Sequence, residues 1–265
     1  MNIQDFYQKL DQLFAQHDMA AIEKYMTDSL TSARLDNEPD AIVAVGNELA
    51  GFYRVSGKVD DAIRLSQNVL QVLKNMGQET TENFAVALQN AANVLVVAGD
   101  RDTAMQMYRT AEQILAYRGF SKDYRMAALH NNISALQREM EDFEEAEKSA
   151  LKSLDIIVNL PQYRTEMATS LVNLGEVQTR LKKFDEAKET LEAAKTIYEL
   201  ESGDRDPHYA AANAALGNLY YYWQKPQEAA PYFRKAMELI ERDHGKNAFY
   251  EMMARNLKTV ASSDV

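Results

Sequence analysis

The sequence contains no cysteine among its 265 residues. Disulfide bonds, thiolate nucleophiles and cysteine-ligated zinc sites are therefore excluded. Basic residues are also scarce, because 29 lysines and arginines stand against 40 aspartates and glutamates, for a net charge of −11. Nucleic-acid binding needs a basic footprint, and anionic membrane surfaces attract basic segments. This balance therefore argues against nucleic acid and against a membrane surface as partners.

Long apolar runs are missing as well. No stretch approaches the roughly 20 apolar residues of a membrane-spanning helix. The first residues, MNIQDFYQKLDQLF, lack the basic and apolar regions of a signal peptide. Alternating apolar and polar runs with β-branched residues are absent too, so no sheet is predicted. We therefore expect a cytoplasmic, all-α protein.

Residues that commonly perform chemistry are sparse. The four histidines, His17, His130, His208 and His244, share no spacing with a carboxylate that is typical of metal sites. The sequence has no glycine-rich phosphate loop and no serine in a nucleophile-elbow context. We expect no catalytic residue, no metal and no cofactor, and a structural role in the core for His130.

Prolines are few, and their positions indicate helices. Four of the five, Pro39, Pro161, Pro207 and Pro226, stand where helices are predicted to begin. Pro231 alone falls about one turn inside a predicted helix.

A motif of about 42 residues recurs along most of the chain. An alanine that follows a predicted turn recurs at positions 62, 104, 146, 187 and 229. Twelve residues before it, each copy carries a small residue, namely Ala50, Ala92, Ser134, Gly175 or Gly217. Two helices can cross closely where small residues face each other. Each copy therefore predicts one helix–turn–helix hairpin.

These hairpins resemble tetratricopeptide repeats. That family has small and large residues at fixed positions, which the fifth copy supplies as Gly217, Ala229, Phe233 and Ala236. The second and fourth copies follow the pattern, whereas the first and third depart at the last two positions. The long period, the segments LHNNISAL and EAAPYFRKAMEL, and Pro231 look like the kinesin-light-chain-type subgroup. The resemblance covers about residues 40–243 and implies a right-handed α-solenoid superhelix of antiparallel helix hairpins.

The repeat divides the chain into three parts. Residues 1–38 are expected to form a degenerate N-terminal capping hairpin, and residues 246–265 a C-terminal capping helix and tail. Residues 39–245 are expected to hold five tetratricopeptide-like repeats, at about 40–80, 81–122, 123–161, 162–206 and 207–245.

The first helices of these hairpins are rich in asparagine, which is a poor residue inside a helix. By resemblance, the first helices line the concave side of the superhelix, where side-chain amides could hold the backbone of an extended peptide. Alternatively, the asparagines cap or cross-link neighbouring helices. The candidate groove residues are Asn47, Asn90, Asn93, Asn131, Asn132, Arg138, Asn173, Glu176, Arg180, Asn218, Tyr221 and Tyr222.

Charged and aromatic residues in this set indicate which kinds of partner group the groove could bind. Arg138 and Arg180 fall near the ends of first helices, where they could meet a carboxylate of a partner or be ordinary solvated side chains. Because Glu176 is in the same set, we do not expect the groove to be uniformly basic. Tyr221 and Tyr222 are expected to face the concave side, where aromatic rings often anchor partners. For Trp223 we expect packing against the C-terminal helix.

We therefore expect a non-catalytic protein–protein interaction scaffold that binds an extended peptide segment in the concave groove. Two alternatives stay open, a peptide-responsive bacterial regulator and a self-associating structural module. The chain would be a monomer, or a homodimer formed through its terminal helices. The partner's identity is not encoded in any motif of the sequence.

Overall fold

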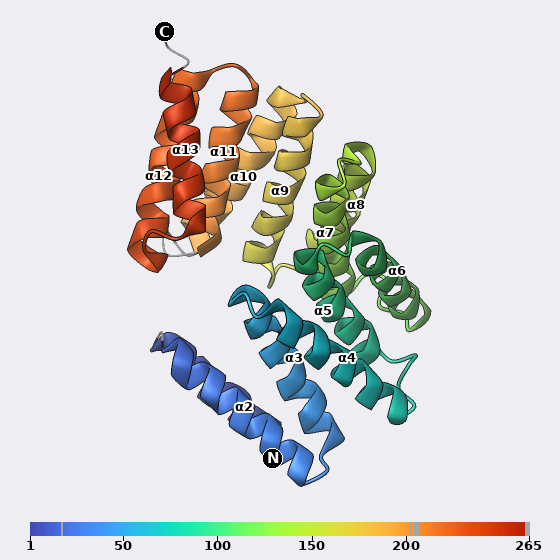
Figure 1. Cartoon of the computed structure of the whole chain (residues 1–265). Helices are drawn as coiled ribbons and strands as arrows, with labels where there is room; N and C mark the ends of the chain where they lie inside the picture. The colour runs from blue at the N-terminus through green and yellow to red at the C-terminus, as the bar shows by residue number, and fades with distance from the viewer. Residues whose placement is uncertain (17, 202, 204–206, 263–265) are drawn as a thin grey trace. The chain divides into compact units, whose positions relative to one another are not determined.

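A computed structural model describes residues 1–16, 18–201, 203 and 207–262 (Figure 1). These residues form thirteen α-helices and no strand, so the all-α prediction is confirmed. Within the described helices, none combines the length and the hydropathy that crossing a bilayer requires. His17 and residues 204–206 lie outside the described part of the chain.

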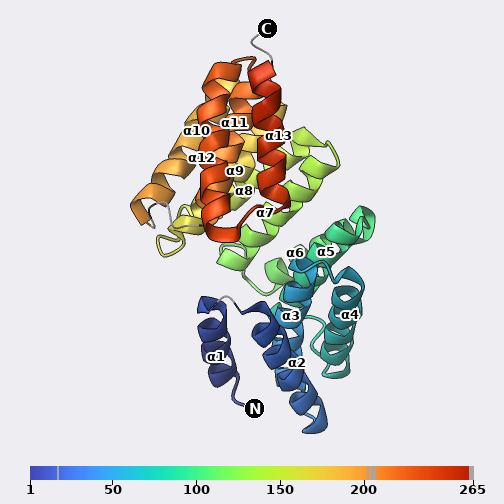
Figure 2. The ribbon, with the colours of Figure 1, turned by 60° about the vertical axis from the view of Figure 1, so that its left-hand side comes forward.

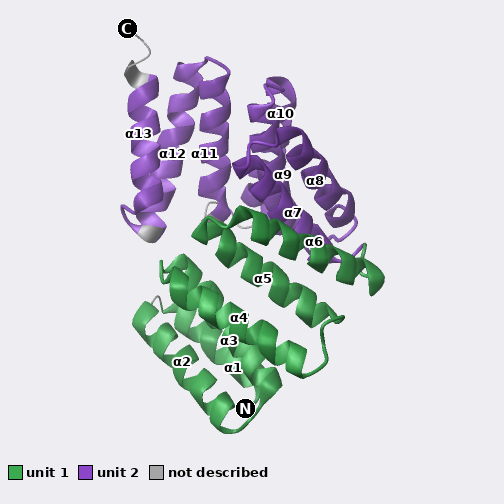
Figure 3. Cartoon of the chain, turned by 45° about the vertical axis from the view of Figure 1, so that its right-hand side comes forward, with its two compact units in different colours: residues 1–121 green, residues 122–265 purple. Residues whose placement is uncertain are grey.

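The helices fall into two compact units, residues 1–121 and residues 122–265 (Figure 3). Unit 1 contains α1 (Ile3–Ala15), α2 (Met19–Leu35), α3 (Pro39–Val55), α4 (Val59–Asn75), α5 (Glu82–Ala98) and α6 (Arg101–Tyr117). Unit 2 contains α7 (Tyr124–Glu139), α8 (Phe143–Ile157), α9 (Arg164–Arg180), α10 (Phe184–Glu201), α11 (Pro207–Tyr222), α12 (Pro226–His244) and α13 (Ala248–Ser262).

Within each unit, consecutive helices pack as hairpins, and hairpins stack on one another. In unit 1, α3 packs on α4 and α5 on α6, while α3 also contacts α5. In unit 2, α9 contacts both α7 and α11, so that the first helices of three hairpins lie next to one another. Figure 2 shows α11, α12 and α13 side by side, with α13 packed on α12. Each unit thus presents a surface built of first helices.

Small residues allow the two helices of a hairpin to approach closely. A Cβ atom on Gly217 of α11 would lie 2.6 Å from the Cδ1 and Cε1 atoms of Phe233 on α12. A Cβ atom on Gly175 of α9 would lie 2.5 Å from Cγ of Leu191 on α10. Because van der Waals contact needs more room than this, only glycine fits at these two crossings without a shift of the neighbouring side chain. The predicted close approach of the two helices is confirmed at both crossings, but each glycine faces a large side chain and not a second small residue.

The turn inside each of the five repeat hairpins, from α3–α4 to α11–α12, contains one residue in the left-handed region. Glycine occupies this position in unit 1, where φ is 78° at Gly57 and 86° at Gly99. In unit 2 the position is held by Glu141, Lys182 and Gln224, with φ of 62°, 61° and 59°. A residue with a Cβ atom costs roughly 1–2 kcal/mol more than glycine in this conformation. The unit 2 hairpins therefore carry local strain at their turns.

Proline marks most of the predicted helix starts. Pro39 and Pro226 occupy the first turn of α3 and α12, and Pro207 begins α11. The prediction for Pro161 is wrong, because α9 begins three residues later, at Arg164. The Tyr163 amide donates a hydrogen bond to the Leu160 carbonyl, which closes a turn over the proline instead. Pro231 lies inside α12 without ending it.

Candidate functional site

Two adjoining cavities open on the first-helix face of unit 2. Their volumes are about 130 and 120 Å³, and Asn218 and Tyr222 of α11 border both. We call these two cavities the unit 2 trough. They bring together six of the predicted groove residues, namely Arg138, Glu176, Arg180, Asn218, Tyr221 and Tyr222.

An ion pair closes one wall of the trough. Nη1 of Arg138 on α7 lies 2.5 Å from Oε2 of Glu176 on α9, and both side chains are largely buried. Burial raises the pKa of the Glu176 carboxyl, and the Arg138 charge opposes this rise. Nε of Arg138 is buried without a hydrogen-bond partner. Arg138 is therefore neutralised by Glu176, although its donor capacity is not exhausted.

Arg180 presents the more available positive charge. Its guanidinium lies 4.5 Å from the ring centroid of Phe143 and 5.9 Å from that of Tyr222. Its Nη2 atom lies 3.9 Å from Oε1 of Glu141, a carboxylate that is itself mostly exposed. Aromatic rings hold the guanidinium plane in place while such a long ion pair contributes little. Arg180 can therefore donate forked hydrogen bonds to an incoming carboxylate.

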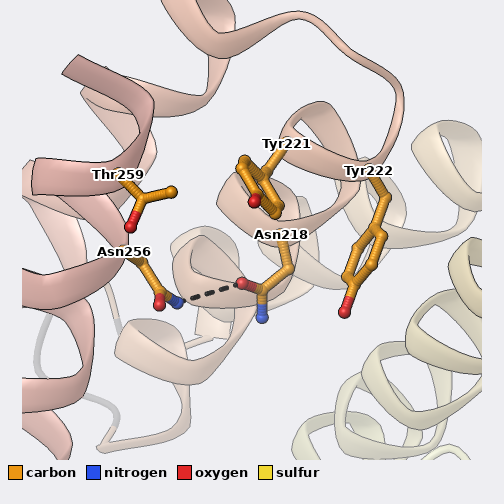
Figure 4. A pocket seen from close by; sticks show the side chains of 5 residues that line it. All are labelled: Asn218, Tyr221, Tyr222, Asn256 and Thr259. Carbon is orange, nitrogen blue, oxygen red and sulfur yellow. Dashed lines mark hydrogen bonds between the residues drawn. The ribbon is translucent and has the colours of Figure 1, made fainter. Parts of the chain in front are cut away.

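Polar and aromatic side chains from α11 and α13 line the other cavity (Figure 4). Asn256 donates a hydrogen bond of 3.3 Å from Nδ2 to Oδ1 of Asn218, which leaves the Asn218 amide nitrogen for another acceptor. The rings of Tyr221 and Tyr222 are 41% and 49% exposed and meet edge to face. The Thr259 hydroxyl lies on the opposite side of the cavity. Such a surface offers both stacking and hydrogen bonding.

Besides Asn218, two of the predicted groove asparagines have structural partners. Asn93 accepts a hydrogen bond from the buried Tyr108 hydroxyl within its own hairpin. Asn131 donates to Oγ of Ser170 on the next first helix, at 2.6 Å. These contacts match the alternative in which asparagines cross-link helices.

Other predicted groove asparagines have no such partner. The side-chain amides of Asn47, Asn90, Asn132 and Asn173 are half-buried and make no hydrogen bond within the described part of the chain. Three of them, Asn90, Asn132 and Asn173, stand 14 residues before the repeat alanines 104, 146 and 187. They therefore occupy one register of the repeat, where the fold makes no use of an amide.

Several trough residues escaped sequence reasoning. Asn256 and Thr259 lie on α13. The amphipathic pattern of this helix predicts only that it covers the end of the repeats, not that it lines a cavity. Phe143 begins α8 and has no motif that indicates contact with an arginine of the next hairpin. Trp223 stacks on Phe184 and on Tyr220, at centroid distances of 5.6 and 6.1 Å, and its packing against the C-terminal helix stays a prediction.

Known proteins share this repeat and fold. Residues 166–242 match the family model described as tetratricopeptide repeat. Protein KINESIN LIGHT CHAIN-RELATED 3 of Arabidopsis thaliana is 24% identical over 215 residues, which are 81% of this chain and 33% of that protein. The chain spans about a third of the length of the curated relatives it matches.

Solved structures with a similar fold include BtubC and NprR. BtubC (BKLC) from P. vanneervenii superposes with a TM-score of 0.69 at 20% identity, over 87% of this chain and 94% of that one. NprR in complex with its cognate peptide NprX gives a TM-score of 0.71 at 15% identity, over 96% of this chain and 71% of that one. At such identities these similarities show the fold alone.

Proposed function

We propose that this chain, whose residues 166–242 match the tetratricopeptide repeat and whose relatives include kinesin-light-chain-related proteins, is a non-catalytic binding scaffold. Its unit 2 trough holds an extended segment of a partner protein. The observation that carries this proposal is the meeting of Arg180, Asn218, Tyr221 and Tyr222 around open cavities. Rigid aromatic rings beside hydrogen-bond donors that are available to a ligand are typical of peptide recognition.

The row of unpartnered amides supports the same function. Asn132 and Asn173 lie on α7 and α9, the first helices that also supply Arg138, Glu176 and Arg180. A side-chain amide both donates and accepts, so it can pair with a peptide bond regardless of the peptide's sequence. We infer that backbone hydrogen bonds at these asparagines hold the segment, while the trough selects its side chains.

The residues that surround the trough favour binding over catalysis. Its titratable groups are an ion-paired Arg138 and Glu176, a stacked Arg180 and two tyrosines. Acid–base catalysis would need a base within hydrogen-bond reach of a reacting group. No group of three or more metal-ligating side chains occurs among the residues that the structure describes. The residues of the trough therefore support the binding of a partner and not the catalysis of a reaction.

Selection from a random peptide display library, followed by affinity measurement, tests the proposal. Peptides that bind the wild-type chain should bind Arg180→Gln or Tyr222→Ala about tenfold more weakly, which corresponds to the loss of about 1.4 kcal/mol. Arg234→Gln is the matched control, because Arg234 is an exposed arginine of α12 in the same unit. Equal affinity for the wild type and both trough variants would refute binding in the trough.

The two alternative roles can be measured in the same preparation. A self-associating module would form a dimer, detected by light scattering, that does not dissociate when a peptide is added. A peptide-responsive regulator would bind a peptide and change the conformation of a second surface. A change in the hydrogen-exchange protection of α1, α2 or α13 on peptide binding would detect this.

A further inference from the structure

Unit 1 contains a second groove, of about 500 Å³, on its own first-helix face. α1 forms one side of this groove, α3 and α5 form its floor, and the end of α4 closes it. We call it the unit 1 groove. It is larger than either cavity of the unit 2 trough and falls in the size range of ligand sites.

The unit 1 groove combines an apolar floor with unpartnered amides. Val43, Ala44 and Val86 are half-buried on the floor. The side-chain amides of Gln78 and Asn83 line the groove and make no hydrogen bond within the described residues. Such a floor accommodates the methylene stem of a long side chain, and the amides can pair with a peptide backbone.

The charge of the unit 1 groove is opposite to that of the unit 2 trough. Asp40 lines the groove, and no lysine or arginine does so among the described residues. Glu48 lies beside it, next to the hydroxyl of the lining Tyr7, which partly offsets the rise in the pKa of Glu48 that burial causes. Neither carboxylate forms an ion pair within the described part of the chain. The pKa of Glu48 is raised, chiefly by burial and further by Asp11, as expected for a carboxylate without a cationic partner.

Glu48 shares one register of the repeat with the unpartnered amides of the later first helices. Glu48 stands 14 residues before Ala62, as Asn90, Asn132 and Asn173 stand before their repeat alanines. The first repeat thus carries a carboxylate where the next three carry an unpartnered amide. A half-buried carboxylate without a cation costs free energy in the folded chain, and a bound cation would recover it.

We propose that the unit 1 groove binds an extended peptide segment through a lysine or arginine side chain. The aliphatic stem lies on Val43, Ala44 and Val86, and the cationic head reaches Asp40 or the Tyr7–Glu48 pair. The amides of Gln78 and Asn83 hold the adjoining peptide bonds. This site extends the proposed binding function to a second segment with a different charge.

Bead-bound heptapeptide pools with one fixed central residue provide the test. The fixed residue is Lys, Arg, Gln or Glu, and the other six are randomised over uncharged amino acids. At 150 mM salt, the full chain should retain the Lys and Arg pools about tenfold better than the Gln pool. At least one of Asp40→Asn and Glu48→Gln should remove most of this preference, while circular dichroism shows that both variants remain folded.

The acidic charge of the whole chain requires a matched control. Asp102 occupies the second position of α6, as Asp40 occupies the second position of α3, and both are exposed. Asp102→Asn should keep the preference for basic pools. No preference in the wild type, an unchanged preference in both groove variants, or an equal loss in Asp102→Asn would each overturn the proposal. If some pool binds in an Arg180-dependent way but basic pools show no preference, this inference fails while the proposed function stands.

Discussion

Replacing Gly217 by alanine tests the close approach on which the last complete hairpin depends. The added Cβ would lie 2.6 Å from two ring atoms of Phe233 and 3.0 Å from a third. Phe233 is 1% exposed and lies between Ala229 and Ala236, which are fully buried. The ring therefore has little space into which it can retreat, and the two helices must separate instead.

Two opposing effects determine the size of the change. Alanine gains roughly 1 kcal/mol over glycine inside a helix, because it loses less backbone entropy on folding. Overpacking a filled crossing costs about 1–3 kcal/mol. Since the obstructing atoms belong to a confined aromatic ring, the cost should be near the upper end of that range. We expect Gly217→Ala to lower the free energy of unfolding of unit 2 by about 1–2 kcal/mol.

Gly51 of α3 supplies the matched control, because a Cβ atom there would meet nothing within 4 Å. Gly51→Ala should raise the stability of unit 1 by about 1 kcal/mol. Urea unfolding measures both effects: Trp223, the single tryptophan, reports unit 2 by fluorescence, and circular dichroism reports both units. If both variants move their midpoints in the same direction, the packing argument is wrong.

Three further predictions concern other positions. Gln224→Gly should stabilise unit 2 by about 1 kcal/mol in urea unfolding, because it relieves a left-handed residue at a turn. Asn132→Ala combined with Asn173→Ala should weaken peptide binding without loss of stability. By contrast, Asn93→Ala should cost unit 1 about 1 kcal/mol, because it removes one hydrogen bond that the buried Tyr108 makes. Glu48→Gln should stabilise unit 1 at pH 7, because the folded-state pKa of Glu48 is raised and its ionised form penalises folding. That gain should vanish at about pH 3.5, below the unfolded-state pKa of about 4.3, where wild-type Glu48 is protonated in both states.

Each of these predictions has a contrary result. Gln224→Gly is refuted by an unchanged or lower midpoint. Unfolding of the Asn132/Asn173 double variant would show that these amides are structural. A Glu48→Gln gain that is equal at both pH values would show that burial of the charge is not its cause.

The fold could be predicted because each of its decisive contacts lies within one hairpin. Gly217 meets Phe233 only 16 residues later, and Gly175 meets Leu191 at the same separation. Such contacts recur with the repeat, so their residue types appear in the sequence as a period. The left-handed turn residues were harder to find, because glycine marks Gly57 and Gly99 but not Glu141, Lys182 and Gln224.

The roles of Asn131 and Asn218 could not be predicted, because their partners lie outside their own hairpins. Asn131 pairs with Ser170, 39 residues away, and Asn218 pairs with Asn256, 38 residues away. The period predicts which face of a helix a side chain occupies, but not which side chain of the next hairpin lies within hydrogen-bond distance. Asparagine on a first helix therefore predicts only where the side chain lies. The contacts in the structure are needed to tell that Asn131 is a structural residue and that its neighbour Asn132 has no partner in the described part of the chain.

Packing and recognition place their demands on different positions of the repeat, which explains how one fold can carry two unlike grooves. The crossing positions admit only small residues, since a single Cβ atom at Gly217 already conflicts with Phe233. The register of Glu48, Asn90, Asn132 and Asn173 is half-exposed, and its three amides make no hydrogen bond within the described residues. A carboxylate can replace an amide there without altering any crossing. The charge of each groove is thus free to vary while the hairpins that build it stay the same.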